Sequence, residues 1–89
     1  MLKPEYTNQF KKDLDLMLRR GKDKQKIADV ISRLVNQTPL EPRHRDHALA
    51  GNFKGRRDCH IDPDWLLIYK IGVDVITFER TGTHSDIFK

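Results

Sequence analysis

The sequence has a single cysteine, Cys59, among its 89 residues. One thiol cannot form an intramolecular disulfide, and it excludes a metal site built from four thiolates. A reducing compartment suits such a chain best, so we expect a cytoplasmic protein. No apolar run approaches the length of a membrane span, and residues 1–10 contain no signal-peptide core. We therefore expect no association with a membrane.

Several motifs that mark common enzyme classes are also absent. The sequence has no P-loop, no glycine fingerprint for dinucleotides, and no HExxH or CxxC motif. A Gly-x-Ser-x-Gly elbow is missing as well, which leaves serine-hydrolase chemistry without support. We expect no cofactor, so any catalysis would depend on the acid, base and cationic side chains of the protein itself.

The chain is short, which limits the kind of site that it can build. A chain of 89 residues is expected to form one domain, residues 1–89, that buries only about 60–65% of its unfolded surface. An open face or shallow groove is expected rather than a deep cavity, and this suits a large substrate. Lys and Arg outnumber Asp and Glu by 17 to 13, which weakly favours a polyanionic partner.

The N-terminal half has the apolar spacing of two amphipathic helices. The first is predicted to begin at a cap on Thr7 or Asn8 and to end at Gly21. The second is predicted to begin at Asp23 and to run through Asn36. Because only a few residues join them, the two helices should form an antiparallel hairpin.

The C-terminal half has the character of a sheet. We interpret residues 40–51 as a loop and residues 81–89 as a polar tail, with three strands between them, over residues 52–61, 65–71 and 73–80. A short extended segment at residues 1–6 completes the prediction of an α+β fold, β-α-α-β-β-β, with a helical hairpin packed on an antiparallel sheet. One sheet face should then be free to carry chemistry.

Polar residues suited to catalysis gather in this half: His47, His60, Asp64, Arg80 and His84. Cleaving RNA without a metal requires a base for the 2′-hydroxyl, an acid for the leaving 5′-oxygen, and a cation for the phosphate. Histidine suits both proton roles because its ordinary pKa of about 6.5 lies near working pH. Arginine suits the third role because its fork matches phosphate oxygens.

Each of these residues also has an ordinary structural interpretation. His60 and His84 could be exposed polar side chains, and Asp64 is typical of a turn. Arg80 follows Ile76 and Phe78 on one predicted strand face, from which it could simply reach solvent. Three of the histidines and Asp64 could together supply four zinc ligands, but their spacing matches no paired-ligand motif, so we expect no metal site.

A resemblance to a known family comes from residues 46–88. They contain DHALAGNFKGRRDCHIDPDWLLIYK and then FERTGTHSDIF. A DH-x-L-x-G stretch, R-D-x-H, P-D-W, and R-x-G-x-H with a trailing aromatic residue follow one another in this order. On these motifs the chain resembles the YafQ branch of the RelE-like toxin family.

That resemblance implies a RelE/ParE-like fold and a ribosome-dependent endoribonuclease that cuts messenger RNA in the ribosomal A site. It further implies that a cognate acidic antitoxin protein holds the toxin inactive, and that operator DNA is bound only through that antitoxin. Two alternatives stay open: a non-catalytic ParE-like toxin that inhibits gyrase, and a basic module that stays bound to ribosomal RNA. The histidine cluster argues against the gyrase inhibitor, because a pure binder needs no paired proton carriers.

The resemblance also assigns roles to individual residues. It implies acid–base roles for His47, His60, Asp64 and His84, a phosphate contact for Arg80, and aromatic contacts near the site for Trp65 and Phe88. We expect His84 to protonate the leaving oxygen and either His60 or Asp64 to act as the base. Trp65 could instead be a core residue. The cations before His60 are either RNA-backbone contacts or ordinary exposed residues: Lys54, Arg56 and Arg57.

Overall fold

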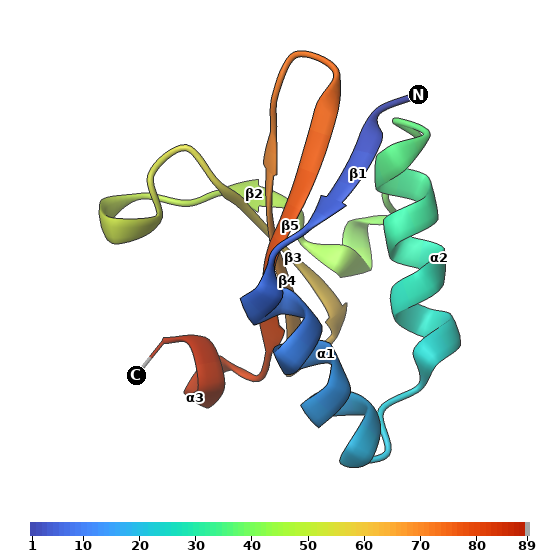
Figure 1. Ribbon diagram of the computed structural model, residues 1–89, viewed down its shortest axis with the longest axis vertical. Coiled ribbons are helices and arrows are strands. Elements are labelled where there is room, and N and C mark those ends of the chain that lie inside the picture. The colour runs from blue at the N-terminus through green and yellow to red at the C-terminus, as the bar shows by residue number, and fades with distance from the viewer. Residues whose placement is uncertain (89) are drawn as a thin grey trace.

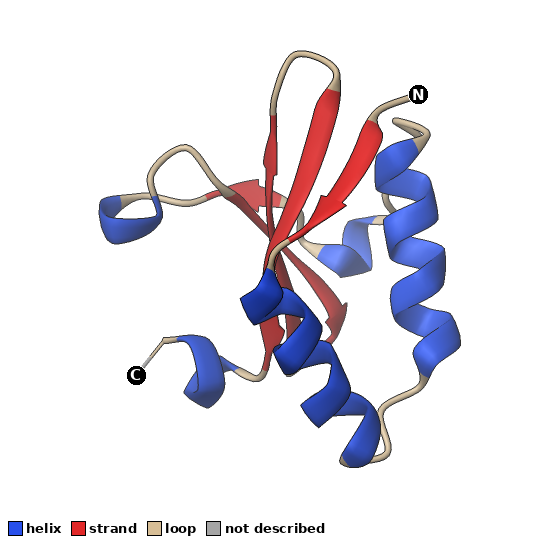
Figure 2. Cartoon of the chain, viewed as in Figure 1, coloured by secondary structure: helices blue, strands red, loops and turns tan. Residues whose placement is uncertain are grey.

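The computed structural model describes residues 1–88, and it confirms the α+β class (Figure 2). The elements in chain order are β1 (Lys3–Tyr6), α1 (Asn8–Arg19), α2 (Lys24–Val35), η1 (Pro42–His44), β2 (His47–Ala48), η2 (Gly51–Phe53), β3 (Arg57–Asp62), β4 (Trp65–Ile71), β5 (Val75–Gly82) and α3 (His84–Ile87), where η marks one turn of 3₁₀ helix. None of the helices within residues 1–88 is long and apolar enough to cross a membrane.

Both long helices begin at the predicted caps. The Thr7 hydroxyl accepts a hydrogen bond from the backbone N–H of Phe10, and the Asp23 carboxylate accepts one from Gln25. The turn after α1 contains Gly21 at φ 88°, a left-handed conformation that favours glycine. From this turn α1 and α2 diverge, and both cover the same face of the sheet (Figure 1).

The strands of residues 1–88 form one sheet in the order β1-β5-β4-β3-β2. Strands β3, β4 and β5 form the predicted antiparallel meander, and β2 continues it on one side. The edge strand β1 instead runs parallel to β5, with Lys3 opposite Val75 and Tyr6 opposite Phe78. The sheet is therefore mixed. The crossover through α1 and α2 brings the chain back so that β3 runs in the direction of β1, and two further reversals, into β4 and then β5, give β5 that direction as well.

Several segments differ from the prediction. The strand expected from residue 52 begins only at Arg57, because Gly51 and Gly55 adopt φ values of 65° and 88° and fold the chain into η2. The expected loop over residues 40–51 contains η1 and the two residues of β2. The expected tail contains the end of β5 and the short helix α3; its last residue, 89, lies outside the described residues.

Two apolar clusters cover the two faces of the sheet. The larger one lies under the helices and contains Met17, Val30, Trp65 and Phe78. The smaller one lies on the opposite face, where Ile87 of α3 packs on the inner strand β4. Because this second face is covered only in part, polar side chains on the neighbouring strands remain accessible around α3.

A β-bulge in β5 decides on which face Arg80 lies. Tyr69 pairs with Phe78 whereas Ile68 pairs with Arg80, so Glu79 is an extra residue without a cross-strand partner. Simple alternation placed Arg80 on the same face as Phe78, and this interpretation was wrong because the bulge moves Arg80 to the partly open face.

A carboxylate on α1 holds the bulged segment. Asp13 is 9% exposed, and it accepts hydrogen bonds from Arg80 Nε at 2.7 Å and from the Thr81 backbone N–H at 3.2 Å. Strand β1 ends opposite Phe78, so the Asp13 carboxylate takes the place of a neighbouring strand for the next part of β5.

We expect Asp13→Asn to lower the free energy of unfolding by about 1–3 kcal/mol, because the new amide removes the charge and one of the acceptor oxygens that Arg80 and Thr81 use. Guanidinium unfolding should show a lower midpoint with an unchanged slope. Asp15→Asn is the matched control: Asp15 is exposed and pairs with Arg19 along the same helix at 3.2 Å, so the change should be below about 0.5 kcal/mol. Equal effects of the two substitutions would contradict the role given to Asp13.

Candidate active site

The residues with catalytic potential lie on the partly open face of the sheet. Cross-strand pairing aligns one row over β2, β3, β4 and β5, formed by His47, Asp58, Ile68 and Arg80. The next row runs through His60, Leu66 and Gly82. Neighbouring strands are about 4.8 Å apart, so the backbone of Arg80 on β5 lies roughly 10 Å from that of Asp58 on β3, two strand spacings away.

His84 and Asp64 meet where α3 begins. Asp64, in the turn between β3 and β4, accepts hydrogen bonds from the His84 backbone N–H at 3.0 Å and from the His84 Nδ1 at 2.6 Å. The His84 backbone hydrogen bond, and then the ring hydrogen bond, lower the pKa of Asp64 below its usual value. An ionised carboxylate only accepts, so Nδ1 carries the hydrogen and Nε2 stays available for a substrate.

His60 lies beside His84, with the two ring centroids 5.6 Å apart and the planes nearly perpendicular. Burial lowers the pKa of His60, against the opposing effect of the Asp58 charge. The neutral imidazole is therefore the favoured form at neutral pH, and a neutral imidazole can accept a proton.

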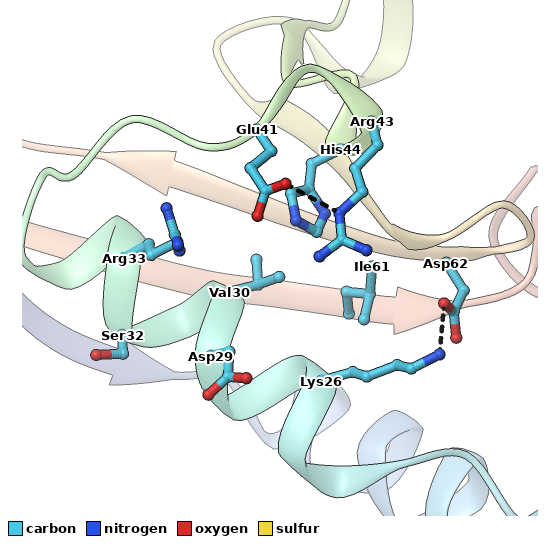
Figure 3. Close-up of a pocket in the computed structure, with 10 residues that line it drawn as sticks. All are labelled: Lys26, Asp29, Val30, Ser32, Arg33, Glu41, Arg43, His44, Ile61 and Asp62. Carbon is cyan, nitrogen blue, oxygen red and sulfur yellow. Dashed lines mark hydrogen bonds and ion pairs between the residues drawn. The ribbon is translucent and has the colours of Figure 1, made fainter.

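A buried histidine supports His60 from the other face of the sheet. The His44 Nδ1 lies 2.7 Å from the His60 carbonyl oxygen and donates to it. His44 also lines a recess between α2 and β3, of about 370 Å³, which Figure 3 shows with its ion pairs of Lys26 with Asp62 and of Arg43 with Glu41. Because charges of both signs pair here, the recess lacks the cationic character of a phosphate site.

His47 approaches the same cluster from β2. Its Nδ1 donates to the Arg45 carbonyl oxygen at 2.7 Å, which leaves Nε2 directed toward Asp58 Oδ2 at 3.8 Å. Strand β2, which sequence analysis assigned to a loop, fixes this position because His47 pairs with Asp58 across the strands. The ring is about half exposed and accessible to a substrate.

Asp58 is a member of the site that the sequence analysis missed. The residue is 3% exposed, and its Oδ1 has no hydrogen-bond partner within residues 1–88. Burial raises the pKa of Asp58, while the nearby charges of His47, His60 and His84 oppose that shift. Asp58 and His60 are two residues apart within the strand predicted over residues 52–61, so alternation places them on one face, and this was the signal that could have identified Asp58.

The predicted RNA contacts divide between the faces. Lys54 is exposed before β3, and Arg56 lies at the edge of the site, where its Nε is 2.6 Å from Glu79. Arg57 pairs across the strands with Tyr69 and so lies on the opposite face, with Asp46 at 3.2 Å. Arg57 therefore does not line the candidate site.

The two predicted aromatic contacts have different environments. Trp65 has no exposed surface, and its Nε1 donates to Thr81 Oγ1 at 2.9 Å, so a direct contact of Trp65 with RNA was a wrong expectation. Phe88 is 40% exposed beside the site. The family resemblance assigned the indole to the site, but strand alternation turns it into the core.

The arrangement can move protons at an exposed phosphodiester. His60 and His84 are two proton carriers in one place, and Arg80 supplies a cation on the same face. In the described part of the chain no group of three or more His, Cys, Asp or Glu side chains is placed to hold a metal ion. The roles of His47, His60, Asp64, Arg80 and His84 stay predictions.

Comparisons with known proteins point to one family. Residues 2–89 match the family described as the bacterial toxin of type II toxin–antitoxin systems, YafQ. The mRNA interferase toxin YafQ of Escherichia coli strain K12 is 46% identical over 85 residues, which cover 94% of this chain and 92% of that protein.

Solved structures agree with this match. The E. coli DinJ–YafQ complex contains a chain with a TM-score of 0.93 and 43% identity, and 100% of each chain is covered. A metal-bound toxin from Helicobacter pylori has a TM-score of 0.92 and 37% identity, with 99% of this chain and 100% of that chain covered.

We expect Asp58→Asn to lower the pKa of His60 further, because the lost negative charge no longer favours the imidazolium. NMR titration of the His60 ring would measure this shift, and the neutral form would persist to lower pH than in the unaltered protein. Asp62→Asn is the control, since Asp62 is on the same strand but pairs with Lys26 of α2 at 3.0 Å. A pKa of His60 that is unchanged in Asp58→Asn would contradict the electrostatic effect of Asp58 on His60.

Proposed function

The chain belongs to the YafQ family of bacterial toxins from type II toxin–antitoxin systems, and we propose that it is an endoribonuclease that cuts messenger RNA on the ribosome. The observation that carries this proposal is the meeting of His60 and His84, 5.6 Å apart, on the sheet face that also presents Arg80. The E. coli relative named mRNA interferase supports the same substrate.

The proposed chemistry uses the nucleophile within the RNA. His60 takes the proton of the 2′-hydroxyl, and the 2′-oxygen attacks the adjacent phosphorus. The bond from phosphorus to the 5′-oxygen breaks, and His84, which enters this step as an imidazolium protonated on both ring nitrogens, donates its Nε2 proton to that leaving oxygen. A 2′,3′-cyclic phosphate and a 5′-hydroxyl result. The burial that lowers the pKa of His60 supports its assignment as base.

Arg80 and Asp64 complete this mechanism. Arg80 holds the scissile phosphate, where its charge stabilises the crowded oxygens of the transition state. Asp64 is a positioning residue, because its hydrogen bonds with His84 orient the ring and leave Nε2 available. This arrangement favours His60 over Asp64 as the base. No step requires a metal ion, although the H. pylori relative is a metal-bound toxin.

The proposed partners are the ribosome with its messenger RNA, in the cytoplasm, and a cognate acidic antitoxin. The catalytic side chains lie on an open sheet face, so control must come from a protein that covers the toxin or holds it away from the ribosome. A net charge of +4 favours an acidic partner that wraps the surface. The solved DinJ–YafQ complex of E. coli supports a partner of this kind.

A message with hydrogen in place of the 2′-hydroxyl at the scissile nucleotide should not be cut. Its phosphates and bases remain, so binding should be nearly unchanged while the nucleophile is absent. Mapping of the cleavage ends on ribosome-bound messages would measure this, and the unmodified message should give a 2′,3′-cyclic or 3′-phosphate with a 5′-hydroxyl downstream.

Cutting of the deoxy message at the normal rate would show that water is the nucleophile and would overturn this mechanism.

Added chelator tests whether the toxin needs a metal ion. The ribosome needs its own magnesium, so the toxin should be treated with EDTA and exchanged into metal-free buffer before it meets intact ribosomes. Activity should survive this treatment, and loss that zinc or copper restores would contradict the metal-free proposal.

Expression of this chain alone should arrest growth, and His84→Ala should relieve the arrest. Loss of one proton carrier should slow cleavage roughly 10²–10⁴-fold, whereas an exposed side chain should change stability by only about 0.5 kcal/mol or less. Ser85→Ala, at the next exposed position of α3, is the matched control and should remain toxic. Full toxicity of a folded His84→Ala protein would exclude His84 as the acid.

A further inference from the structure

Two hollows adjoin at Arg80. The first, about 690 Å³, extends toward α3 and is lined by Asp86, Ile87 and Phe88. The second, about 360 Å³, extends toward the start of α1 and is lined by Thr7, Gln9 and Arg56. Both are also lined by the same three residues, Asn52, Phe53 and Arg80. The turn η2 and Arg80 thus form the divide between two hollows of a size that can hold a ligand group.

The larger hollow has an aromatic wall that arises from two distant parts of the chain. Phe53 of η2 and Phe88 after α3 lie with their ring centroids 5.4 Å apart and their planes at 78°. Phe53 is half-buried, packed against the cluster of Leu66, Ile68 and Ile87. Phe88 is 40% exposed. Aromatic surface therefore remains open beside the cation that the proposed function assigns to the scissile phosphate.

We propose that Phe53, together with Phe88, forms a stacking site for an unpaired nucleobase next to the scissile phosphate. This inference rests on the proposed function and names an RNA-binding residue that it does not include. With the phosphate at Arg80, a neighbouring base enters the larger hollow and lies against the phenyl rings. Asn52, which lines the same hollow, offers amide groups to the edge of the base.

The chemistry of the hollow favours a nucleobase over a purely apolar ligand. Phenyl rings provide flat surfaces on which any base can stack, while the shared Arg80 attracts the phosphate that is attached to that base. The Asp86 carboxylate does not oppose this, because it pairs with Arg20 at 2.9 Å and accepts the Thr83 N–H at 3.0 Å. Trp65 cannot take this role because it has no exposed surface.

The test compares the rates at which protein variants cut ribosome-bound messages with and without one base. An abasic ribonucleotide, which keeps the 2′-hydroxyl and the phosphates, replaces each nucleotide around the cleavage site in turn. Phe53→Leu keeps an apolar side chain on the Leu66 cluster but removes the ring. It should lower kcat/KM on the intact message roughly 5- to 150-fold, the usual range for loss of one stacked base.

The decisive result is the lack of additivity. On the message that lacks the stacked base, the Phe53→Leu protein should cut as fast as the unaltered protein cuts that same message, because the base on which the ring would stack is already missing. Phe53→Trp should retain activity on the intact message. Leu49→Ala is the matched control: Leu49 packs against the same cluster but lines neither hollow, so its effect should be equal on intact and abasic messages.

Each other outcome is equally clear. If Phe53→Leu is impaired by the same factor on every abasic message, the ring only supports the fold and the stacking site is overturned. If Phe53→Leu cuts the intact message at the normal rate, the inference is likewise wrong. If the unaltered protein cuts no message at all, the proposed function fails first and this inference fails with it.

Discussion

The Asp13 carboxylate is the interaction on which the site depends most. Strand β5 extends beyond the end of its neighbour β1, and at this point Asp13 accepts the Thr81 N–H and the Arg80 guanidinium. The Thr81 hydroxyl in turn accepts from the indole of Trp65 and donates to the Leu66 carbonyl. A continuous set of hydrogen bonds thus joins α1, the bulge and the core, and it holds the cation on the open face.

The histidines are held by a different device, which suits proton transfer. His47 and His84 each donate from Nδ1 to an oxygen, of the Arg45 backbone in one case and of the Asp64 side chain in the other. Nδ1 of each ring therefore carries a hydrogen, and Nε2 is the nitrogen left to gain or lose a proton. Asp58 lies beneath them as a buried carboxylate whose raised pKa reflects its burial. Fixed donors and acceptors of this kind need little rearrangement when charge develops on a substrate.

The sequence predicted those features that depend on neighbours along the chain. The caps at Thr7 and Asp23, and the strand over residues 65–71, were confirmed because local hydrogen bonding and apolar spacing determine them. Arg80 could not be placed, because the bulge depends on pairing with β4 and on Asp13, 67 positions away. The family resemblance implied roles for the histidines, and these roles stay predictions; the gyrase-inhibitor alternative gains no support from the relatives. The resemblance assigned the buried Trp65 to the site and did not name Phe53, whose placement depends on two glycines with positive φ.

The parallel pairing of β1 with β5 also has a consequence for how the chain reaches its folded form. Residues 3–6 find their strand partner only at residues 75–78, so this part of the sheet closes through contacts of very long sequence separation, which form late and slowly. Strand β5, which contains residues 75–78, also carries Arg80 and precedes His84. A growing polypeptide that has not yet reached β5 therefore lacks both a finished sheet and Arg80, the cation to which the proposed function assigns the phosphate. On the proposed function, the same segment of chain completes both the sheet and the candidate site, so a translation product interrupted before β5 should lack toxicity.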